Sequence, residues 1–251
     1  MPTLSLAFDV AQGFPYLFNI NHFFMTHGHL DHAAGIPYLI SQKSMSAHKQ
    51  PTFYMPHSMI EPMKQIMSGW AQIEKYEYPY QFVGVKETDT FEINRNYFVR
   101  PFKTVHRVDS FGYTLFHTKT KLKPAMALLS QNELREVRES GQEITQQLET
   151  PLVSFTGDTQ IEFLDAAPWI KKSKILFLES TYLDQDKSIQ SARDWGHTHL
   201  DEIIPRLDEL ECEKIVLIHS SARYSLEHAL DLLIKKIPPQ HQNKVILFPG
   251  R

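Results

Sequence analysis

The sequence predicts an α/β fold, and three observations lead to that prediction. Short apolar runs typical of buried strands alternate with segments whose apolar residues recur at helical spacing. In the second half, three successive strands each end in a polar residue, and active sites of α/β folds commonly gather at such ends. Near the start, one strand-to-helix turn carries four potential metal ligands within six residues, His27-Gly28-His29-Leu30-Asp31-His32.

The composition is that of a globular protein. The chain has 251 residues, 42% hydrophobic and 22% charged, and we expect one domain over residues 1–251. A net charge of −3 gives no global basic field for nucleic acid. The single cysteine, Cys212, excludes an internal disulfide framework and a cysteine-based zinc site. The N-terminus lacks a secretion signal and no apolar run reaches membrane-spanning length, so we expect a cytoplasmic protein without a membrane partner.

The first third of the chain contains the elements around the ligand-bearing turn. Alternating apolar residues up to Phe8 predict an opening strand, and a turn over 9–13 follows it. The apolar run in the middle of 22–26 predicts a buried strand that leads into the ligands, and 33–43 predicts a helix with an early proline. Because His27 and His29 are two residues apart, they share one face in extended geometry, whereas Asp31 and His32 follow the turn.

The next elements are predicted by apolar spacing. A short strand over 52–55 precedes a helix from Pro56 to about Ile73. Residues at helical spacing in that helix predict a core-facing stripe of Ile60, Met63, Ile66, Met67 and Trp70. Further strands are predicted over 82–86, 89–94, 96–105 and 112–116.

Segment 119–150 is the least globular part of the sequence. It begins with Lys119, Lys121 and Lys123, and a polar helix is predicted around 130–148. Charge runs of this kind are usually solvated faces, although the segment lies between two ligand candidates and could overhang the site.

The second half repeats a strand and a helix. Strands over 151–155, 174–178 and 214–218 end next to Asp158, Glu179 and His219 respectively. The intervening helices are predicted over 161–168, 199–210 and 225–236, with a last strand over 245–248.

The turn at residues 27–32 resembles the H-x-H-x-D-H signature of the metallo-β-lactamase superfamily of hydrolases. The resemblance implies a four-layer αβ/βα sandwich with metals at one edge between two sheets. His106, Asp158 and His219 match the rest of the pattern in order. Singly, each could be a turn aspartate or a strand-end histidine, but the ordered set favours metal ligands. By resemblance, one metal would be held by His27, His29 and His106, and a second by Asp31, His32 and His219, with Asp158 bridging them.

This ligand set implies a dinuclear centre. Two divalent cations about 3.5–4 Å apart repel each other, and an anionic bridge offsets that repulsion. A metal lowers the pKa of bound water from 15.7 to about 7, so the nucleophile would be a metal-bound hydroxide. Zn²⁺ is the first choice for histidine and carboxylate ligands, and Mn²⁺ or Fe would fit the same residues.

Three further segments resemble the ribonuclease Z branch of the superfamily. Glu179 lies in a stretch similar to E-A-T-F, His197 in one similar to G-H-S-T, and residues 219–224 are similar to H-F-S-x-R-Y. The resemblance implies a phosphodiesterase in which His197 is the general acid, Glu179 orients it, and Asp31 also belongs to the catalytic set. His197 could instead hold a third metal or be structural. Arg223 could bind a substrate phosphate oxygen or form a salt bridge. We expect His199 to cap the next helix.

The sequence also departs from this branch. The long glycine- and proline-rich arm that clamps transfer RNA is not evident in 119–150, which has one glycine, Gly141. Ala11 replaces the first glycine of a D-x-G-x-G-like turn, and little chain precedes it, so we expect a trimmed first sheet.

The expected function is that of a dinuclear metal-dependent phosphodiesterase that cleaves RNA near its 3′ end, and the substrate is left open between a transfer RNA precursor and another RNA. The alternatives are hydrolysis of a small or cyclic phosphodiester, and a non-catalytic protein that binds metal and nucleic acid or a ligand. The His197 pair argues against a binding-only role and against β-lactam hydrolysis. A homodimer is among the expected assemblies.

Overall fold

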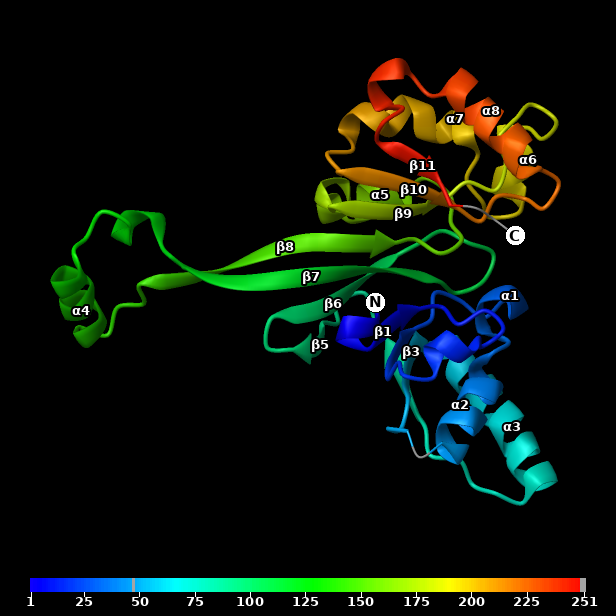
Figure 1. The fold of residues 1–251 in the computed structure, drawn as a ribbon, viewed down its shortest axis with the longest axis horizontal. Helices are drawn as coiled ribbons and strands as arrows, with labels where there is room; N and C mark the ends of the chain where they lie inside the picture. Colours follow the sequence, from blue (N-terminus) through cyan, green and yellow to red (C-terminus); the bar gives the residue numbers. More distant parts are fainter. Residues whose placement is uncertain (47, 249–251) are drawn as a thin grey trace.

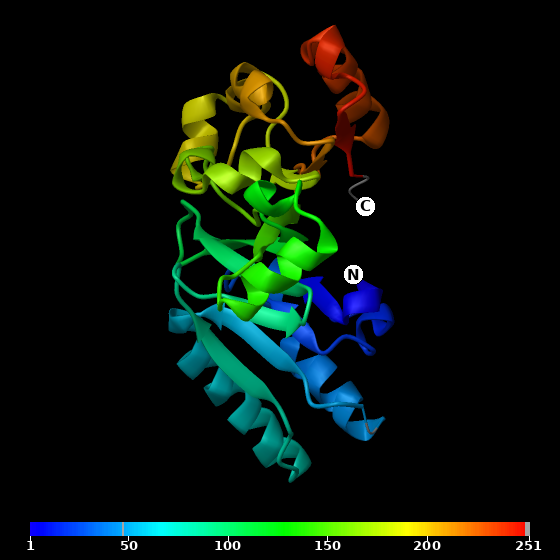
Figure 2. The same cartoon turned by 90° about the vertical axis from the view of Figure 1, so that its left-hand side faces the viewer.

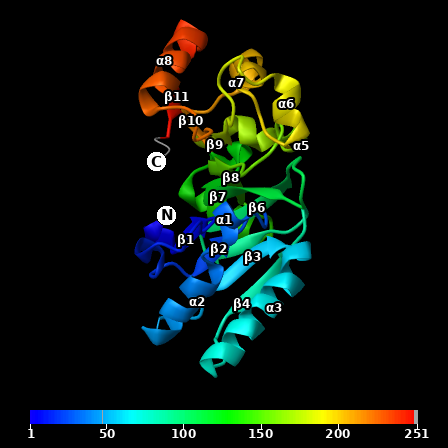
Figure 3. The same cartoon turned by 90° about the vertical axis from the view of Figure 1, so that its right-hand side faces the viewer.

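The computed structural model describes residues 1–46 and 48–248, and two β-sheets face each other in it with helices on their outer sides (Figures 1 and 3). The first sheet has four parallel strands in the order β1-β2-β3-β4, and the second has the order β11-β10-β9-β8-β7-β6-β5. Helices α2 and α3 cover the first sheet, and α5 to α8 cover the second (Figure 3). The predicted four-layer sandwich is therefore confirmed.

The strands of the first sheet are β1 (Leu6–Phe8), β2 (His22–Phe24), β3 (Thr52–Pro56) and β4 (Gln81–Val85). Those of the second are β5 (Phe91–Asn94), β6 (Tyr97–Lys103), β7 (Phe111–Leu122), β8 (Thr145–Phe155), β9 (Ile175–Glu179), β10 (Lys214–Ile218) and β11 (Val245–Leu247). The helices are α1 (Leu30–Ala33), α2 (Ile36–Met45), α3 (His57–Glu74), α4 (Gln131–Glu139), α5 (Phe163–Ala166), α6 (Ile189–Asp194), α7 (Leu200–Ile203) and α8 (Leu226–Lys236). Short α6 was not predicted. The helix predicted over 199–210 is an α-helix only in α7 and continues as a 3₁₀ segment, because Pro205 cannot donate a backbone hydrogen bond.

Helix α3 packs on the first sheet through a row of methionines. Met59, Met63 and Met67 are buried, and they are four residues apart, so they lie on one helix face. Ile66 and Trp70 are each 46% exposed, and their predicted place in the core was wrong. They lie on a neighbouring row of the helix surface, and Trp70 lines a surface cavity with Pro37 and Tyr38 of α2.

The most prominent feature outside the sandwich is a long hairpin. Strands β7 and β8 pair antiparallel from Tyr113↔Phe155 out to Leu122↔Thr145, and α4 lies at their tip, away from the body (Figure 1). We call residues 117–150 the arm. The helix predicted over 130–148 was too long, because α4 ends at Glu139. Ser130 and Glu133 form a capping box at its start, and Gly141 follows its end with φ +82°, a left-handed conformation that suits glycine.

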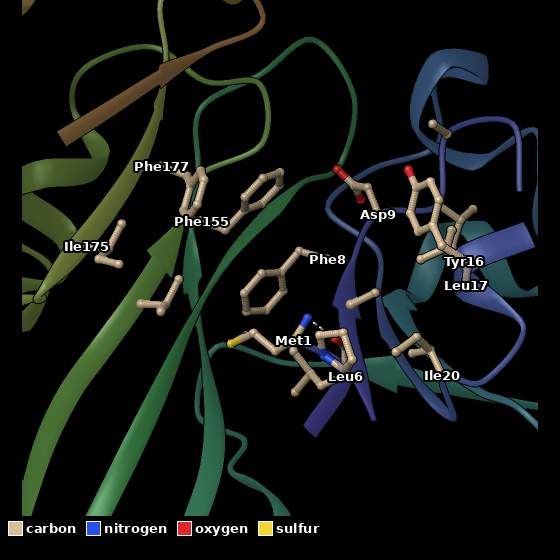
Figure 4. A pocket seen from close by; sticks show the side chains of 15 residues that line it. Met1, Leu6, Phe8, Asp9, Tyr16, Leu17, Ile20, Phe155, Ile175 and Phe177 are labelled. Carbon is tan, nitrogen blue, oxygen red and sulfur yellow. Dashed lines mark hydrogen bonds between the residues drawn. The ribbon is translucent and has the colours of Figure 1, made fainter. Parts of the chain in front are cut away.

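Strand β1 is the edge of the first sheet, which has four strands against seven in the second. The Met1 amine donates to the Leu6 carbonyl across 2.8 Å beside this edge. An apolar cavity of about 600 Å³ lies between β1 and the second sheet, where Phe8, Phe155 and Phe177 face one another (Figure 4).

Within the described residues, none of the helices combines the length and apolar character that a bilayer crossing requires. Cys212 is buried, and burial raises the pKa of its thiol to about 11, which fits a packing role.

Candidate metal centre

The predicted ligands come from strand ends and loops at one edge of the two sheets. The segment after β2 carries His27 and His29 and turns into α1, which carries Asp31 and His32. The remaining three ligands follow β6, β8 and β10, and they are His106, Asp158 and His219 respectively. The chain turns from β10 with His219 itself in the left-handed region, at φ +58°.

All seven predicted ligands lie together, in two groups. Ligand atoms of the first group lie within 4.8 Å of one another, and the group consists of His27, His29, His106 and Asp158. The second group meets the same limit and consists of Asp31, His32 and His219. Asp158 Oδ2 is 3.6 Å from His27 Nε2 and 3.4 Å from His219 Nε2, so this carboxylate lies between the groups. The geometry reproduces the grouping that the resemblance implied.

The chemistry of this cluster fits a divalent metal. Asp158 is 2% exposed, and its Oδ1 makes no hydrogen bond to the described residues, although His32 Nε2 lies 3.4 Å away. An unpartnered buried carboxylate oxygen is costly unless a cation meets it. Burial, together with the charge on His32, lowers the pKa of His27 to about 3, which keeps that imidazole in the neutral form that metals bind.

Four of the five clustered imidazoles have the same orientation. Each presents Nε2 to the centre and directs Nδ1 outward, where a protein oxygen fixes the tautomer. The outward contacts are His27 to Thr26 Oγ1 (2.9 Å), His32 to Asp9 Oδ2 (2.7 Å), His106 to the Gly196 carbonyl (2.7 Å) and His219 to Thr181 Oγ1 (3.0 Å). His29 has the opposite orientation, and its Nδ1 is 3.1 Å from His27 Nε2.

Two threonines connect these histidines to carboxylates, the buried Glu179 and the slightly exposed Asp9. The Thr26 hydroxyl donates to Asp9 Oδ2 across 2.8 Å, and the Thr181 hydroxyl donates to Glu179 Oε2 across 2.9 Å. Each hydroxyl therefore accepts the Nδ1 proton of its neighbouring histidine. Sequence analysis placed Asp9 only in a turn and missed its role, although its position directly after the first strand was a usable signal.

Glu179 also holds His197. Nδ1 of His197 donates to Glu179 Oε1 across 3.0 Å, and the His197 ring lies 5.2 Å from that of His106 and 5.3 Å from that of His219, between centroids. Glu179 is fully buried. Its other donors are the backbone amides of Thr159, Thr181 and Thr198 and the Thr181 hydroxyl. Asp158, His197 and His219 form a third ligand-like group, so the open alternative for His197 is geometrically reasonable.

Two other predicted residues lie nearby in different settings. His199 accepts a hydrogen bond from the Asp201 amide at the start of α7, and its predicted capping role is confirmed. Arg223 is exposed, with its guanidinium carbon 5.2 Å from the centroid of the Tyr182 ring and its Nε donating to Ser221 Oγ. A polar cavity of about 620 Å³ beside Asp31 and His219 is lined by serines 220, 221 and 225.

A buried carboxylate among five imidazoles, with a Glu–His pair at its side, defines the centre of a metal-dependent hydrolase. Comparison with known proteins agrees with this class. The family model described as the beta-lactamase superfamily domain matches residues 9–220, a range that includes every predicted ligand. The chain is 34% identical to tRNase Z TRZ1 of Arabidopsis thaliana over 246 residues, covering 97% of this chain and 88% of the relative.

Solved structures show the same fold. The short form of human tRNase Z gives a TM-score of 0.59 at 16% identity, covering 98% of this chain and 85% of that one. The metallo-β-lactamase fold protein YhfI of Bacillus subtilis gives 0.61 at 15% identity, covering 97% and 84%. The chain belongs to the metallo-β-lactamase superfamily, within its ribonuclease Z group, and it is a phosphodiesterase of that type.

Proposed function

We propose that this protein cleaves RNA near its 3′ end, with a transfer RNA precursor as substrate. The observation that carries the proposal is the Glu179–His197 pair beside the Asp158 carboxylate, because a binding-only site has no need of a positioned acid. The 34% identity to an Arabidopsis tRNase Z over most of both chains supports the same substrate class.

We propose two Zn²⁺ ions per chain, although Mn²⁺ or Fe would suit the same residues. His27, His29 and His106 would hold one ion, and Asp31, His32 and His219 the other, with Asp158 shared. When bound, the ions would supply an activated water nucleophile and would stabilise charge on the phosphate. The remaining chemistry belongs to the side chains around them.

His197 would protonate the leaving oxygen of the phosphodiester. Glu179 accepts the Nδ1 proton of His197, which fixes the ring and stabilises its positive form. Asp31 has a 64% exposed side chain at the mouth of the centre, where it would contact substrate as well as metal. Arg223 would bind a non-reacting phosphate oxygen, since its guanidinium is exposed and stacked on Tyr182.

The arm would provide the RNA contact remote from the cleaved bond. The sequence lacks the glycine- and proline-rich arm expected for this group, but a helix-tipped hairpin projects from the body in segment 117–150 (Figure 1), and Figure 2 views this hairpin from the side of its tip. Lys119 and Lys121 are exposed on β7, and Lys123 follows at its end. Phosphate contacts through such lysines would be strongly salt-dependent.

A second candidate is hydrolysis of a small or cyclic phosphodiester. The polar cavity beside Asp31 and His219 favours it, because its volume of about 620 Å³ suits a small ligand. The net charge of −3 also favours a small substrate, since it gives no broad electrostatic attraction for RNA.

The deciding experiment measures hydrolysis of bis-p-nitrophenyl phosphate and of a precursor transfer RNA, with metal analysis of the same sample. Cleavage of both, with specific cutting at the RNA 3′ end, supports the proposal. Hydrolysis of the nitrophenyl ester alone supports the small-substrate candidate. Loaded metal with no hydrolysis of either would support the binding-only alternative.

Three expectations stay predictions. They are the single domain over residues 1–251, the cytoplasmic location and the homodimer, and sedimentation equilibrium would check the last.

A further inference from the structure

An exposed tryptophan stacks with an arginine on the two chain segments that carry His106 and His197. The Arg107 guanidinium carbon lies 4.7 Å from the centroid of the Trp195 ring, and Trp195 is 55% exposed. Arg107 immediately follows the ligand His106, and Trp195 stands two residues before His197. The pair therefore belongs to the same two segments as a ligand and the proposed acid.

Backbone contacts fix the two segments against each other. The Gly196 carbonyl accepts the Nδ1 proton of His106 across 2.7 Å. Gly196 has φ +76°, and a Cβ there would lie 2.7 Å from His106 Nδ1 and 3.0 Å from the Arg107 amide, so the close approach requires glycine. The two segments are therefore linked by two side-chain contacts, one between His106 and His197 and the other between Arg107 and Trp195.

Core packing does not explain the exposed indole. Trp195 lies outside the buried clusters of the described residues, and none of those residues accepts a hydrogen bond from its indole NH. Trp169, in contrast, donates to the Thr114 hydroxyl across 3.1 Å. Arg107 is also free of ion pairs in the described part of the chain, where the paired arginines are Arg100, Arg135, Arg193 and Arg206.

An exposed aromatic face next to an unpaired guanidinium suits a nucleobase. Bases of single-stranded nucleic acid stack on aromatic side chains and on guanidinium planes, and this contact tolerates every base because each has a π-face. Because Arg107 rests on the indole, less side-chain freedom is lost when a ligand binds.

We propose that Trp195 and Arg107 bind the nucleoside that carries the leaving oxygen, by stacking its base. The inference rests on the proposed function, in which His197 protonates that oxygen. The nucleoside attached to it then lies on the His197 side of the centre, where the neighbouring pair is Arg107 and Trp195. The pair would favour nucleic acid over diesters that have no base.

The kinetic test compares Trp195→Ala and Arg107→Ala with the control Trp70→Ala. Trp70 is similarly exposed but lies on α3. Three substrates are compared. The first is an RNA, and the second is the same RNA without the base of the nucleoside that carries the leaving oxygen, which the product ends identify. The third is bis-p-nitrophenyl phosphate. We expect Trp195→Ala to lower kcat/KM for the intact RNA about 5- to 100-fold. The abasic RNA and the ester should be unaffected. Equal losses on all three substrates, or no loss on any, would overturn the inference.

A binding test is independent of turnover and metal loading. Adenosine monophosphate should quench tryptophan fluorescence of the metal-free protein, Trp195→Phe should remove most of that quenching, and Trp70→Phe should retain it. Unchanged quenching in Trp195→Phe, or none in the wild type, would overturn the inference. If the wild-type enzyme hydrolyses neither RNA nor ester, the proposed function fails, and the quenching result still judges this site separately.

Discussion

Asp9 accepts a hydrogen bond from His32 Nδ1 across 2.7 Å, although the two residues are 23 positions apart. The same carboxylate accepts from the backbone amide and the hydroxyl of Thr26, whose hydroxyl in turn contacts His27. One aspartate thus sets the orientation of a histidine in each ligand group.

We expect Asp9→Asn to weaken metal binding about 10- to 100-fold, because partners of this kind raise ligand basicity and fix the ring. Competition with a chromogenic chelator measures the affinity. Asp231→Asn on α8 is the control, since Asp231 is paired with Lys235 on that helix. Equal affinities in wild type and Asp9→Asn would contradict the supporting role.

Asp158→Ala should lose bound metal. It removes the carboxylate shared by the two groups and would leave two neighbouring cations unscreened. Elemental analysis after gel filtration should show less than the wild-type metal content. Full metal in this variant would contradict the bridging assignment.

His197→Ala should keep its metal but lose turnover. A general acid typically contributes ~10²–10⁴-fold, and substrates with good leaving groups need it least. The loss should therefore be smaller for a nitrophenyl ester than for an alkyl phosphodiester. Equal losses on the two substrates would rule out the acid role.

The metal-free protein should become less stable as pH rises above neutrality. Burial opposes charge on His32, but Asp9 and Asp158 outweigh burial and raise its pKa to about 11. The ordinary value is about 6.5, so the stabilisation is complete below that pH and is lost as pH rises toward 11. Urea unfolding in the presence of chelator at pH 7 and pH 9.5 measures this, and Asp9→Asn should show a weaker dependence. A wild-type midpoint that rises with pH would contradict it.

Replacing Lys119, Lys121 and Lys123 with alanine should weaken binding of precursor RNA and leave ester hydrolysis unchanged. Each phosphate contact contributes about 0.7 to the salt slope for a single strand, so the slope should fall by about 2. Lys171, Lys172 and Lys174 form the control set, in which Lys171 and Lys174 are already ion-paired with Glu209 and Glu213. An unchanged slope in the arm variant would exclude these lysines as RNA contacts.

The sequence predicts the metal cluster better than its surroundings. Apolar runs predict the strands that lead to Asp158 and His219, and the resemblance to the superfamily pattern adds His106 and joins all three to the histidine-rich turn. The groups that hydrogen-bond to those ligands could not be predicted. Thr26, Thr181 and the Gly196 carbonyl act through single hydrogen bonds, and a lone threonine or glycine carries no periodic pattern.

The arm shows a different limit. Residues 117–122 and 145–150 are polar except for Leu122 and Leu148, so neither strand gives the hydrophobic alternation that marks a half-buried sheet. Their pairing comes from continuity with the buried parts of β7 and β8, which is a tertiary effect. The polar composition near the tip favoured helix, and the predicted helix therefore extended into β8.

The length of the arm fixes how far its tip lies from the metal centre. Strand β7 has 12 residues and spans about 40 Å at ~3.3 Å per residue. It begins five residues after His106, and β8 ends three residues before Asp158. The tip and the metal centre are therefore joined by one strand pair, whose length would set the separation of the proposed RNA contact on the arm from the cleaved bond. Deleting two residues from each strand preserves which side chains share a face and draws α4 inward by about 7 Å. An RNA gripped at both places would then be cut at a displaced position.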